Sequence, residues 1–412
     1  MGAKKYMWEN IAHITELREA FNDPNFNFNP SGKLVIYPKN NEFIESADFR
    51  LAYKFNIYAV EPESRAYIYV DAKTGEIIGR QDLIHTADVQ GSATTRYSGV
   101  RKITTDQVSS SSYRLRETGR GNGIQTMNAK KTTSTAGATD FTDTDNDWNN
   151  VNANMDEAAT DAHWATEMTY DYYKNVHNRN SIDGNGFKLI NYVHWDQNLF
   201  NAFWNGQYMA YGDGTGKGPL TAVDVGAHEM THGLTSNTAA LNYSGESGAL
   251  NESFSDIFGA CVEVYGKGTA GEWTVGEDFQ TIRDMKNPGA FSHPDTYNGT
   301  NWASTTGADN GGVHTNSGVQ NKWFFILTDG ESGTNDNGDA YTVTGIGIDK
   351  AAKIAFRNLT VYLTSSSNYA SARTNALKSA TDLYGNCSPE YIATADAWNA
   401  VGVGAKSGCS TA

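Results

Sequence analysis

The sequence is poor in positive charge. It has 412 residues, with 32 Lys and Arg against 47 Asp and Glu, so its formal net charge is −15. A surface that binds nucleic acid needs a basic face, and this balance argues against DNA or RNA as a partner. At this length the chain can form two or three domains, each with its own core.

Long apolar runs are also missing. No stretch is long enough to span a bilayer, and the N-terminus, Met1-Gly2-Ala3-Lys4-Lys5-Tyr6, has no signal-peptide core. Proline is scarce, with 8 residues against 41 glycines, while aromatic residues make up 12% of the chain. This composition suits a globular, loop-rich protein.

The chain has three cysteines, which cannot all pair with one another. Cys261 falls in an apolar helical pattern and is expected to be a small buried residue. Cys387 and Cys409 flank the last predicted helix and could form a disulfide in an oxidising compartment. The sequence alone leaves their distance open.

The most informative stretch is 224–232, which reads Asp-Val-Gly-Ala-His-Glu-Met-Thr-His. It is predicted to be helical, which places His228 and His232 side by side on one face, with Glu229 next to them. Two imidazoles can bind zinc, and Glu229 can take a proton from water that the metal acidifies. The alternative is two buried helix histidines beside an ordinary Glu. A chance match to this pattern is expected in about one chain in a hundred of this composition.

A second predicted helix, at 248–259, offers the rest of the metal site. Glu252 and Asp256 lie four residues apart on one face of it. A catalytic zinc takes three protein ligands, and Glu252 is the candidate third ligand. Asp256 and Asn251 are candidates to orient the imidazoles from behind. Without the histidine motif, such a helix would more often be a solvated acidic face.

Both stretches resemble the thermolysin family of zinc metallopeptidases, and the similarity covers about residues 87–403. The resemblance implies an α+β protein with a two-lobe catalytic domain. A mixed α/β lobe would occupy 87–240, a helical lobe 241–403 and a tail 404–412, with the zinc helix between the lobes. Five more segments carry the likeness, in family order: 161–163, 170–179, 201–206, 309–318 and 379–385.

Residues 1–86 differ from the rest of the chain in their sequence pattern. An alternating pattern at 51–57 and strand-like runs at 66–70 and 76–84 predict strands, with a glycine turn at Asp71–Gly75. A helix is also expected around 6–21, hence a small α+β domain. The segment 67–78 resembles the propeptide module of the same family. That resemblance implies a folding aid and inhibitor, with processing near Ile84–Asp88.

The resemblance also assigns roles to residues that would not stand out alone. His314 and Tyr243 would stabilise the oxyanion, with Asp309 holding the imidazole of His314. Arg283 would bind a substrate carbonyl, and the segment 201–206 would be the sheet edge along which substrate adds as a strand. The loop 216–219 is shorter than usual and lacks the aromatic residue typical there. The expected substrate contacts are Asn201 and Ala202 on the edge, and Leu220, Val225 and Ile282 in a pocket for a bulky apolar residue.

Calcium is expected as a structural ion, with at least one site. The main cluster matches the family with one extra residue before Glu272, and Thr274 replaces an acidic residue. The segment 278–282 is too short for a calcium loop that some members have, so that site is predicted to be absent. A second loop carries three carboxylates at alternate positions and would by itself more often be a solvated acidic loop. The candidate ligands are Asp224, Glu263, Glu272 and Glu277 in the cluster, and Asp143, Asp145 and Asp147 in the loop.

The sequence therefore predicts a secreted, zinc-dependent neutral endopeptidase in zymogen form that cuts before bulky hydrophobic residues. Its partners would be peptide and protein substrates and its own residues 1–86, with no nucleic acid and no membrane span. One alternative is a non-catalytic zinc- or calcium-stabilised binding module, which the presence of Glu229 disfavours. Another is an aminopeptidase, for which no acidic motif that binds a free amino terminus is found. The natural substrate and the oligomeric state stay open.

Overall fold

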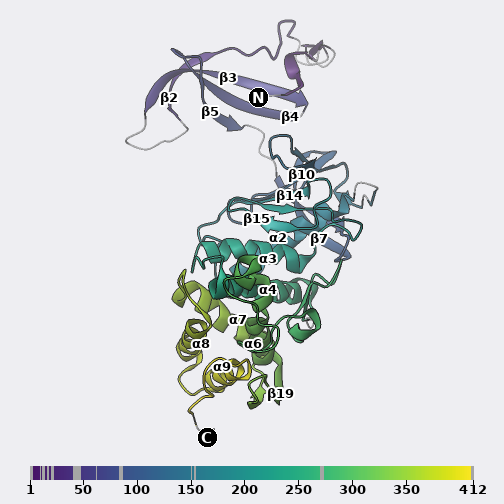
Figure 1. Ribbon diagram of the computed structural model, residues 1–412. Coiled ribbons are helices and arrows are strands. Elements are labelled where there is room, and N and C mark those ends of the chain that lie inside the picture. Colours follow the sequence, from purple (N-terminus) through teal and green to yellow (C-terminus); the bar gives the residue numbers. More distant parts are fainter. Residues whose placement is uncertain are drawn as a thin grey trace. The chain divides into compact units, whose positions relative to one another are not determined.

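The computed structural model describes residues 3–9, 11, 14–15, 18–19, 23–39, 48–61, 63–82, 87–149, 151–152, 155–269 and 273–409. The chain divides into two compact units, Met1–Ala87 and Asp88–Ala412 (Figure 1). Three predictions fall wholly or partly outside the described residues: the helix expected around 6–21, the part of the expected processing site from Ile84 to Thr86, and the expected calcium ligand Glu272.

The first unit is built on an antiparallel sheet. The alternating pattern at 51–57 lies within the long strand β3, which pairs with β4, and β4 pairs in turn with β5. The predicted turn is present: Gly75 has φ +76° and its N–H bonds to the carbonyl of Asp71. The described elements are β1 Lys5–Tyr6, η1 Met7–Glu9, β2 Lys33–Pro38, β3 Phe49–Glu61, β4 Glu63–Asp71 and β5 Ile77–Asp82.

The second unit begins with two sheets. One has the order β11-β10-β14-β16-β15, with β9 also paired to β10, so that β15 forms an edge. The other has the order β12-β8-β7-β6-β13. The strands are β6 Ala87–Thr94, β7 Val100–Ser109, β8 Ser112–Arg114, β9 Arg116–Glu117, β10 Ile124–Thr132, β11 Thr139–Asp140, β12 Thr142–Asp143, β13 Asp147–Trp148, β14 Leu189–Trp195, β15 Ala202–Trp204 and β16 Met209–Tyr211.

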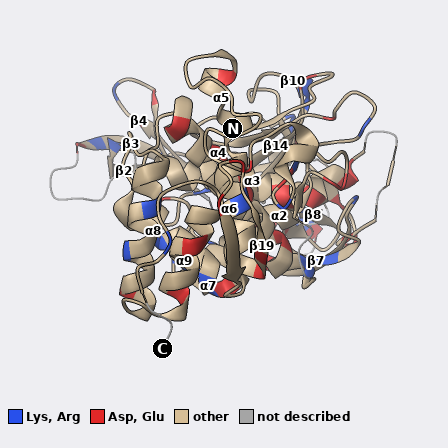
Figure 2. Ribbon diagram, turned by 60° about the horizontal axis from the view of Figure 1, so that its bottom comes forward, with Lys and Arg blue, Asp and Glu red and all other residues tan. Residues whose placement is uncertain are grey.

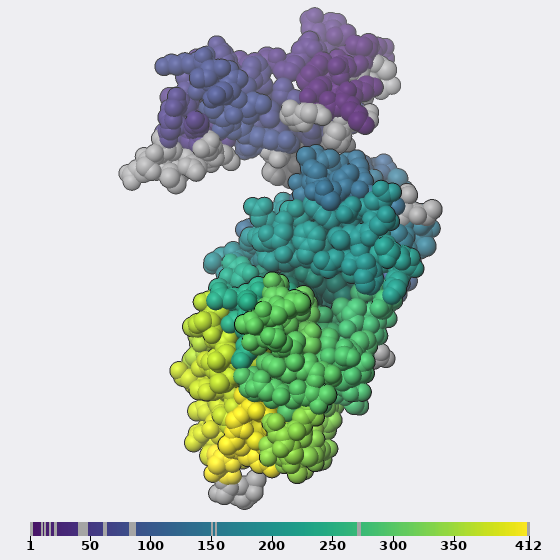
Figure 3. Space-filling view, viewed as in Figure 1, coloured from purple at the N-terminus to yellow at the C-terminus, as the bar shows by residue number. Residues whose placement is uncertain are grey.

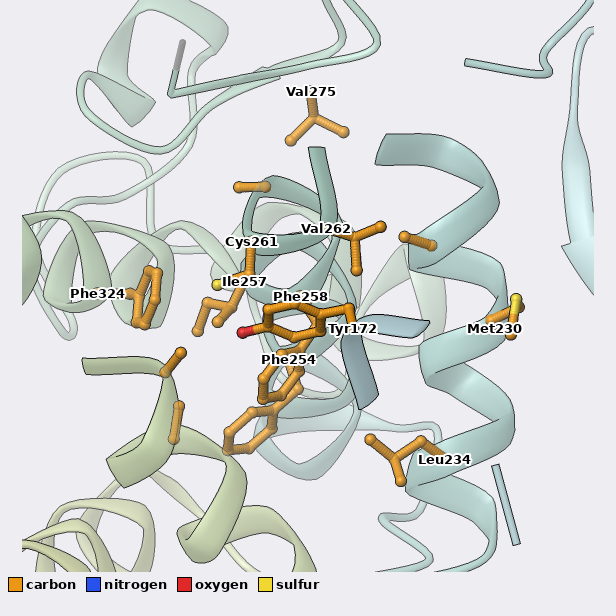
Figure 4. Close-up of a cluster of buried hydrophobic side chains, with 14 of the residues drawn as sticks. Tyr172, Met230, Leu234, Phe254, Ile257, Phe258, Cys261, Val262, Val275 and Phe324 are labelled. Carbon is orange, nitrogen blue, oxygen red and sulfur yellow. The ribbon is translucent and has the colours of Figure 1, made fainter. Parts of the chain in front are cut away.

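Three long helices form the centre of this unit: α2 Glu157–His177, α3 Val223–Ser236 and α4 Gly245–Lys267. Their apolar residues share one core, in which Phe254, Phe258 and Leu234 are fully buried (Figure 4). α2 is rich in buried alanines, and it ends at Asn178, whose left-handed conformation (φ 52°) caps the helix. The helices that carry the candidate metal ligands are thus held by close packing.

The rest of the unit is mainly helical, as the resemblance implied. One departure is the hairpin of β19 and β20, which follows directly after α6. The elements are β17 Thr274–Val275, β18 Arg283–Asp284, η3 Pro288–Phe291, α5 Ala308–Asn316, α6 Gly318–Asp329, β19 Gly330–Thr334, β20 Ala340–Thr344, α7 Ile348–Arg357, η4 Asn358–Tyr362, α8 Tyr369–Tyr384 and α9 Pro389–Ala400.

Residues 404–409, which were expected to be a tail, are bonded to the rest of the unit. Cys387 and Cys409 form a disulfide, Lys406 donates to the carbonyl of Ala340, and the N–H of Ser407 donates to Asp396. Cys261 is free and buried, as expected. This segment therefore belongs to the folded unit as far as Cys409.

Lys and Arg are interspersed with Asp and Glu over the C-terminal helices of this unit (Figure 2). In the space-filling view, the teal segment before about residue 240 and the green to yellow segment after it adjoin within the unit (Figure 3). Of the helices in the described part of the chain, none is long and apolar enough to cross a membrane.

Candidate functional site

The helix α3 presents the predicted zinc motif on one buried face. His228 and His232 lie one turn apart, and their Nε2 atoms approach to 3.1 Å. His228 is 7% exposed, and its ring meets that of His232 edge-on, with centroids 4.7 Å apart. Both imidazoles therefore aim their outer nitrogens at one point.

The helix α4 brings Glu252 to the same point. Its Oε2 lies 3.5 Å from Nε2 of His228, and its Oε1 lies 3.4 Å from Nε2 of His232. In a tetrahedral zinc site with bonds of about 2.0–2.1 Å, neighbouring ligand atoms stand roughly 3.3 Å apart, so the three distances fit. Among the residues that the structure describes, this is the one place where three such ligand atoms lie within 4.8 Å of one another.

Two further residues of α4 orient the imidazoles. The Nδ1 atom of His228 lies 2.9 Å from Oδ1 of Asp256, and that of His232 lies 2.8 Å from Oδ1 of Asn251. Because these oxygens accept the Nδ1 protons, each Nε2 is left as a lone-pair donor for a metal. The orientation is the one that a zinc site requires.

Asp256 joins this site to a substrate-binding candidate. It is 1% exposed and accepts two hydrogen bonds from Arg283, at 2.8 and 2.7 Å. With the bond from His228, these make three, and the side-chain N–H of Asn321 donates a fourth to Asp256 at 2.8 Å. The amide oxygen of Asn321 in turn accepts from the hydroxyl of Ser253 at 2.7 Å. No sequence pattern marks Asn321, which is a polar residue in the largely apolar helix α6.

The electrostatics favour a cation between the ligands. Burial disfavours a charged His228, but the neighbouring carboxylates of Asp256 and Glu252 outweigh burial and raise the pKa of its ring to about 10. Burial also favours a protonated Glu252, but His232 and His228 hold the pKa of that carboxyl well below its usual range. The ligand carboxylate thus stays charged, and Glu252 Oε2 is buried with no hydrogen-bond partner among the described residues. These residues fit a zinc ion.

Glu229 lies beside the ligands and lines the cleft. Its Oε2 accepts a hydrogen bond of 2.9 Å from the backbone N–H of Trp204 in β15. The contact fixes the carboxylate against the sheet edge on which a peptide would lie. The sequence did not predict this contact, since it joins residues 25 positions apart through the backbone.

The predicted oxyanion residues also line the cleft. The Oη atom of Tyr243 lies 3.2 Å from Nε2 of His314, and the phenol of Tyr243 donates to Oε1 of Glu252. Burial and the Glu252 carboxylate raise the pKa of Tyr243 above its ordinary value, so its phenol keeps the proton. Asp309 accepts from Nδ1 of His314 at 2.6 Å and from its backbone N–H at 2.9 Å.

A left-handed turn holds that histidine in place. The four residues 309–312 all have positive φ, between 50° and 86°. Asp and Asn tolerate this conformation better than most residues, and glycine adopts it freely. Gly311 is also needed for space, since a Cβ there would lie 2.2 Å from the carbonyl oxygen of Thr305. The turn brings Asp309 back over His314.

These residues enclose a cleft of about 610 Å³. The sheet edge β15 forms one wall, and Ala202 pairs with Tyr211 of β16 on its inner side. Asp256 and Asn251 support the ligands, and Asp309 lies behind His314. The predicted residues that line the cleft are Asn201, Ala202, Leu220, Val225, His228, Glu229, His232, Tyr243, Asn251, Glu252, Ile282, Arg283 and His314. Other lining residues, not predicted, include Trp204, Leu241, Val275 and Phe279.

The described members of the expected calcium cluster influence one another's pKa and are incompletely paired, but no three of their ligand atoms lie within 4.8 Å of one another. Asp224 accepts from the N–H of Gly276 with Oδ2, while its Oδ1 and Glu277 Oε2 are buried without a described hydrogen-bond partner. Burial and Glu263 raise the pKa of Asp224 to about 7, and burial, Asp224 and Glu263 raise that of Glu277 to about 8. Lys267 lies 2.8 Å from Glu263 and neutralises part of this charge.

The second expected calcium loop uses its carboxylates locally. Asp143 accepts from the backbone N–H groups of Asp145 and Asn146, at 3.0 and 2.7 Å. Asp145 accepts in the same way from Asp147 at 3.0 Å. These bonds close successive turns, and the side chains of Asp145 and Asp147 are exposed. The loop geometry is thus explained without an ion.

Comparison with known proteins identifies the family. Residues 90–236 match the model of the thermolysin metallopeptidase catalytic domain, and residues 239–403 match that of its alpha-helical domain. A bacillolysin of Brevibacillus brevis is 41% identical over 391 residues, covering 92% of this chain and 68% of the relative. A thermolysin of Bacillus sp. (strain EA1) is 39% identical over 396 residues, covering 90% of this chain and 69% of the relative.

A solved structure is also similar. It is the precursor of protealysin, a metalloproteinase from Serratia proteamaculans, with a TM-score of 0.57 and 29% sequence identity. The match covers 68% of this chain and 87% of the protealysin precursor chain. With the convergent His-His-Glu site, these findings confirm the predicted two-domain fold and the predicted enzyme class. The chain belongs to the thermolysin family of metallopeptidases and is a zinc metalloendopeptidase.

Proposed function

We propose that this endopeptidase is secreted as a zymogen and cuts peptide chains before bulky apolar residues, with His228, His232 and Glu252 as the zinc ligands. The observation that carries the proposal is the convergence of these three side chains beside Glu229 in one cleft. Zinc bound there would polarise the attacking water and the scissile carbonyl and offset the negative charge that develops.

Glu229 is proposed as the proton carrier. Its carboxylate would take a proton from the attacking water and deliver it to the leaving amine, in the manner of general acid–base catalysis. The N–H of Trp204, at 2.9 Å, holds one oxygen of the carboxylate in place for both transfers. A substrate strand paired along β15 would pass directly over this carboxylate.

Tyr243 and His314 are proposed to donate hydrogen bonds to the carbonyl oxygen as it becomes negative. The raised pKa of Tyr243, caused by burial and Glu252, keeps its proton available. For His314 to donate from Nε2, both ring nitrogens must carry protons. Asp309, at 2.6 Å from Nδ1, stabilises that state.

The substrate would be held by polar groups at the backbone and an apolar pocket at one side chain. Asn201 and Ala202 offer contacts along the edge strand, and Arg283 reaches the cleft with its remaining N–H groups while Asp256 holds the other side of its guanidinium. The apolar residues Leu220, Val225 and Ile282 would receive the residue that follows the scissile bond.

Residues 1–86 are proposed to be a propeptide that assists folding and inhibits the enzyme until cleavage near 84–88. The similarity to a protealysin precursor supports this, as does the division of the chain after Ala87. We further propose one structural calcium ion at Asp224, Glu263 and Glu277, with Glu272 as a fourth ligand. The unpaired buried oxygens of Asp224 and Glu277 support that site.

The test uses the full chain, wild type and Glu229→Gln, with and without 1,10-phenanthroline. Intact mass followed over time should show cleavage near residues 84–88 only in the wild type without chelator. Both proteins, nicked with the same amount of trypsin, should then be assayed on casein. The Glu229→Gln protein should bind one zinc and lose about 10²–10⁴-fold in turnover.

Zinc-loaded, nicked wild type that leaves the internal bonds of casein intact would refute the proposal and favour a zinc-stabilised binding module. Release of single N-terminal residues alone would indicate an aminopeptidase. A matched control is Glu246→Gln in the first turn of α4, where the carboxylate bonds to Tyr297 and Tyr369 outside the cleft. This variant should keep casein cleavage.

A further inference from the structure

The sheet that contains the edge strand β15 has an outer face that the mechanism above leaves unused. Side chains that alternate along its strands fall into two groups. In β16, Met209 and Tyr211 belong to the main core shared with α2 and α3, whereas Ala210 between them belongs to a small separate cluster. The described members of this cluster are Ala129, Trp195 and Ala210, which are buried, and Tyr192, Leu199, Phe203 and Tyr208, which are partly buried. All of them come from strands of this sheet or from the loops between them.

An irregular residue in β14 brings two large rings to this face. Tyr192 and Trp195 are three positions apart, and a regular strand would direct them to opposite faces. His194 lies between them with φ +58°, and the pairing of β14 with β10 shifts register at this point. The Nδ1 atom of His194 lies 2.5 Å from Oδ1 of the buried Asp213, which fixes the irregular backbone. Both rings therefore belong to the same cluster, as they would after a β-bulge.

Four aromatic rings form a row that starts at the cleft. Phe203 lines the cleft and meets Trp195 edge-on, with ring centroids 6.0 Å apart. Trp195 lies 5.6 Å from Tyr208 in the turn between β15 and β16, and Tyr208 lies 4.8 Å from Tyr192. Tyr192 and Tyr208 are not among the residues that line the cleft. This aromatic row thus continues from the cleft over at most about the length of five extended residues.

The row is held in a fixed shape. Phe203 pairs directly with Ala210, whose small side chain leaves room for the rings on that face. The N–H of Tyr208 donates to Oδ1 of Asn205 at 2.9 Å, and the N–H of Asn205 donates to the carbonyl of Tyr208 at 3.2 Å. A surface that is already ordered loses little conformational freedom when a partner binds to it.

The chemistry of the row suits an extended apolar chain. All members of the cluster are apolar or aromatic, and none carries a charge. Aromatic-lined grooves bind proline-rich segments, whose extended conformation is formed before binding. We propose that the aromatic row is a second substrate-binding surface, which takes a proline-rich, extended stretch of the substrate outside the residues held in the cleft. This inference rests on the proposed binding of substrate along β15.

Such a surface should affect long substrates and leave short ones unchanged. Its contacts lie away from the reacting bond, so they add binding energy that a peptide confined to the cleft does not use. The loss of an aromatic side chain that anchors a partner commonly weakens binding about fivefold or more. The effect should therefore appear mainly in KM.

The experiment uses an internally quenched peptide that fills the cleft, and the same peptide lengthened by five residues at one end or the other. The added tail is either five prolines or Ser-Gly-Ser-Gly-Ser, which has the same number of residues but is polar and flexible. Each enzyme is made as the full chain and matured by the same treatment. For the wild type, the proline tail at one of the two ends should raise kcat/KM at least about fivefold over the polar tail.

Two variants remove rings that lie outside the cleft. Tyr192→Ser and Tyr208→Ser should each reduce the advantage of the proline tail to less than about twofold, and both should cut the peptide without a tail as fast as the wild type. The matched control is Tyr113→Ser, because Tyr113 is also a partly buried tyrosine but lies in β8 of the other sheet. It should keep the full advantage. The zinc-loaded Glu229→Gln protein, nicked with trypsin, should bind the two tailed peptides with Kd values that differ by the same factor.

Equal kcat/KM for the two tails at both ends of the peptide would overturn the inference. An advantage that persists in Tyr192→Ser and Tyr208→Ser would also overturn it, and so would one lost equally in Tyr113→Ser. If zinc content or thermal unfolding shows that one serine variant does not fold, the other variant decides. If the wild type cuts none of the peptides, the proposed function fails. The Kd values for Glu229→Gln then decide the inference separately, and equal values for the two tails would refute it.

Discussion

Substituting Asp256 by asparagine should disturb the metal site more than such a small change suggests. Each carboxylate oxygen accepts two hydrogen bonds: Oδ1 from His228 and Arg283, and Oδ2 from Arg283 and Asn321. Asparagine has one carbonyl oxygen, so its NH2 group must face one of these pairs of donors. At least two of the four bonds are lost in either orientation.

The substitution should reduce both the stability of the protein and its affinity for zinc. Arg283 is 8% exposed, and a buried charge that loses its partner costs about 3–5 kcal/mol. Loss of the residue that orients a ligand imidazole weakens metal binding by about 10–100-fold. Zinc affinity should be measured by chelator competition, and stability by thermal unfolding of the metal-free protein. Both measurements should be made on proteins that also carry Glu229→Gln, because this substitution prevents self-digestion.

A double substitution separates the two effects. Asp256→Asn with Arg283→Met removes the unpaired guanidinium, so it should unfold at a higher temperature than Asp256→Asn alone. It should not regain zinc affinity, because the orientation of His228 stays impaired. An Asp256→Asn protein that binds zinc within twofold of wild type and unfolds at the same temperature would refute this reasoning.

Three further predictions concern other parts of the second unit. Burial lowers the pKa of His163 to about 4, so the unfolded state binds a proton at this residue more readily than the folded state. The free energy of unfolding should therefore fall as the pH drops from about 6.5 to about 4, and it should fall less steeply in His163→Gln. Thermal unfolding at several pH values checks this, and parallel curves would contradict it. Calcium should raise the unfolding temperature of the Glu229→Gln protein, and Asp224→Asn should abolish that response; an equal response in both would exclude the cluster. Gly311→Ala should lower kcat/KM about 100-fold with unchanged zinc content, because it displaces His314, whereas Gly338→Ala, also at positive φ but with open space around it, should not.

Local patterns predicted much of the fold. The alternation at 51–57 and the helical pattern at 248–259 predicted a strand and a helix that the structure confirms, because each is decided within one segment. The hairpin of β19 and β20 was not predicted. Its residues, Gly330–Thr334 and Ala340–Thr344, are mostly polar or small and carry little apolar alternation, and they pair only once α6 has brought them together.

The candidate site also contains some residues that a local pattern predicts and others that it does not. The pairing of His228 with His232 follows from helical spacing, which is local, and Glu252 could be proposed from the zinc ion's need for a third ligand. Asn321 and Phe279 could not be found in this way. Each matters through neighbours distant in sequence, and nothing in their own segments marks them. Such residues require the tertiary arrangement.

Substitutions at the zinc ligands should have different effects from substitutions elsewhere in the cleft, because the two sets of residues lie in different surroundings. The ligands and their supports lie on α3 and α4, where Glu252 and Asp256 are each 1% exposed. Changes there alter packing and charge in a dense interior and should affect zinc binding and stability together. Phe279 lines the cleft from the loop between β17 and β18 and is only partly buried. Changes at Phe279 should therefore alter substrate choice while zinc stays bound, which is how one fold can keep its chemistry and vary its specificity.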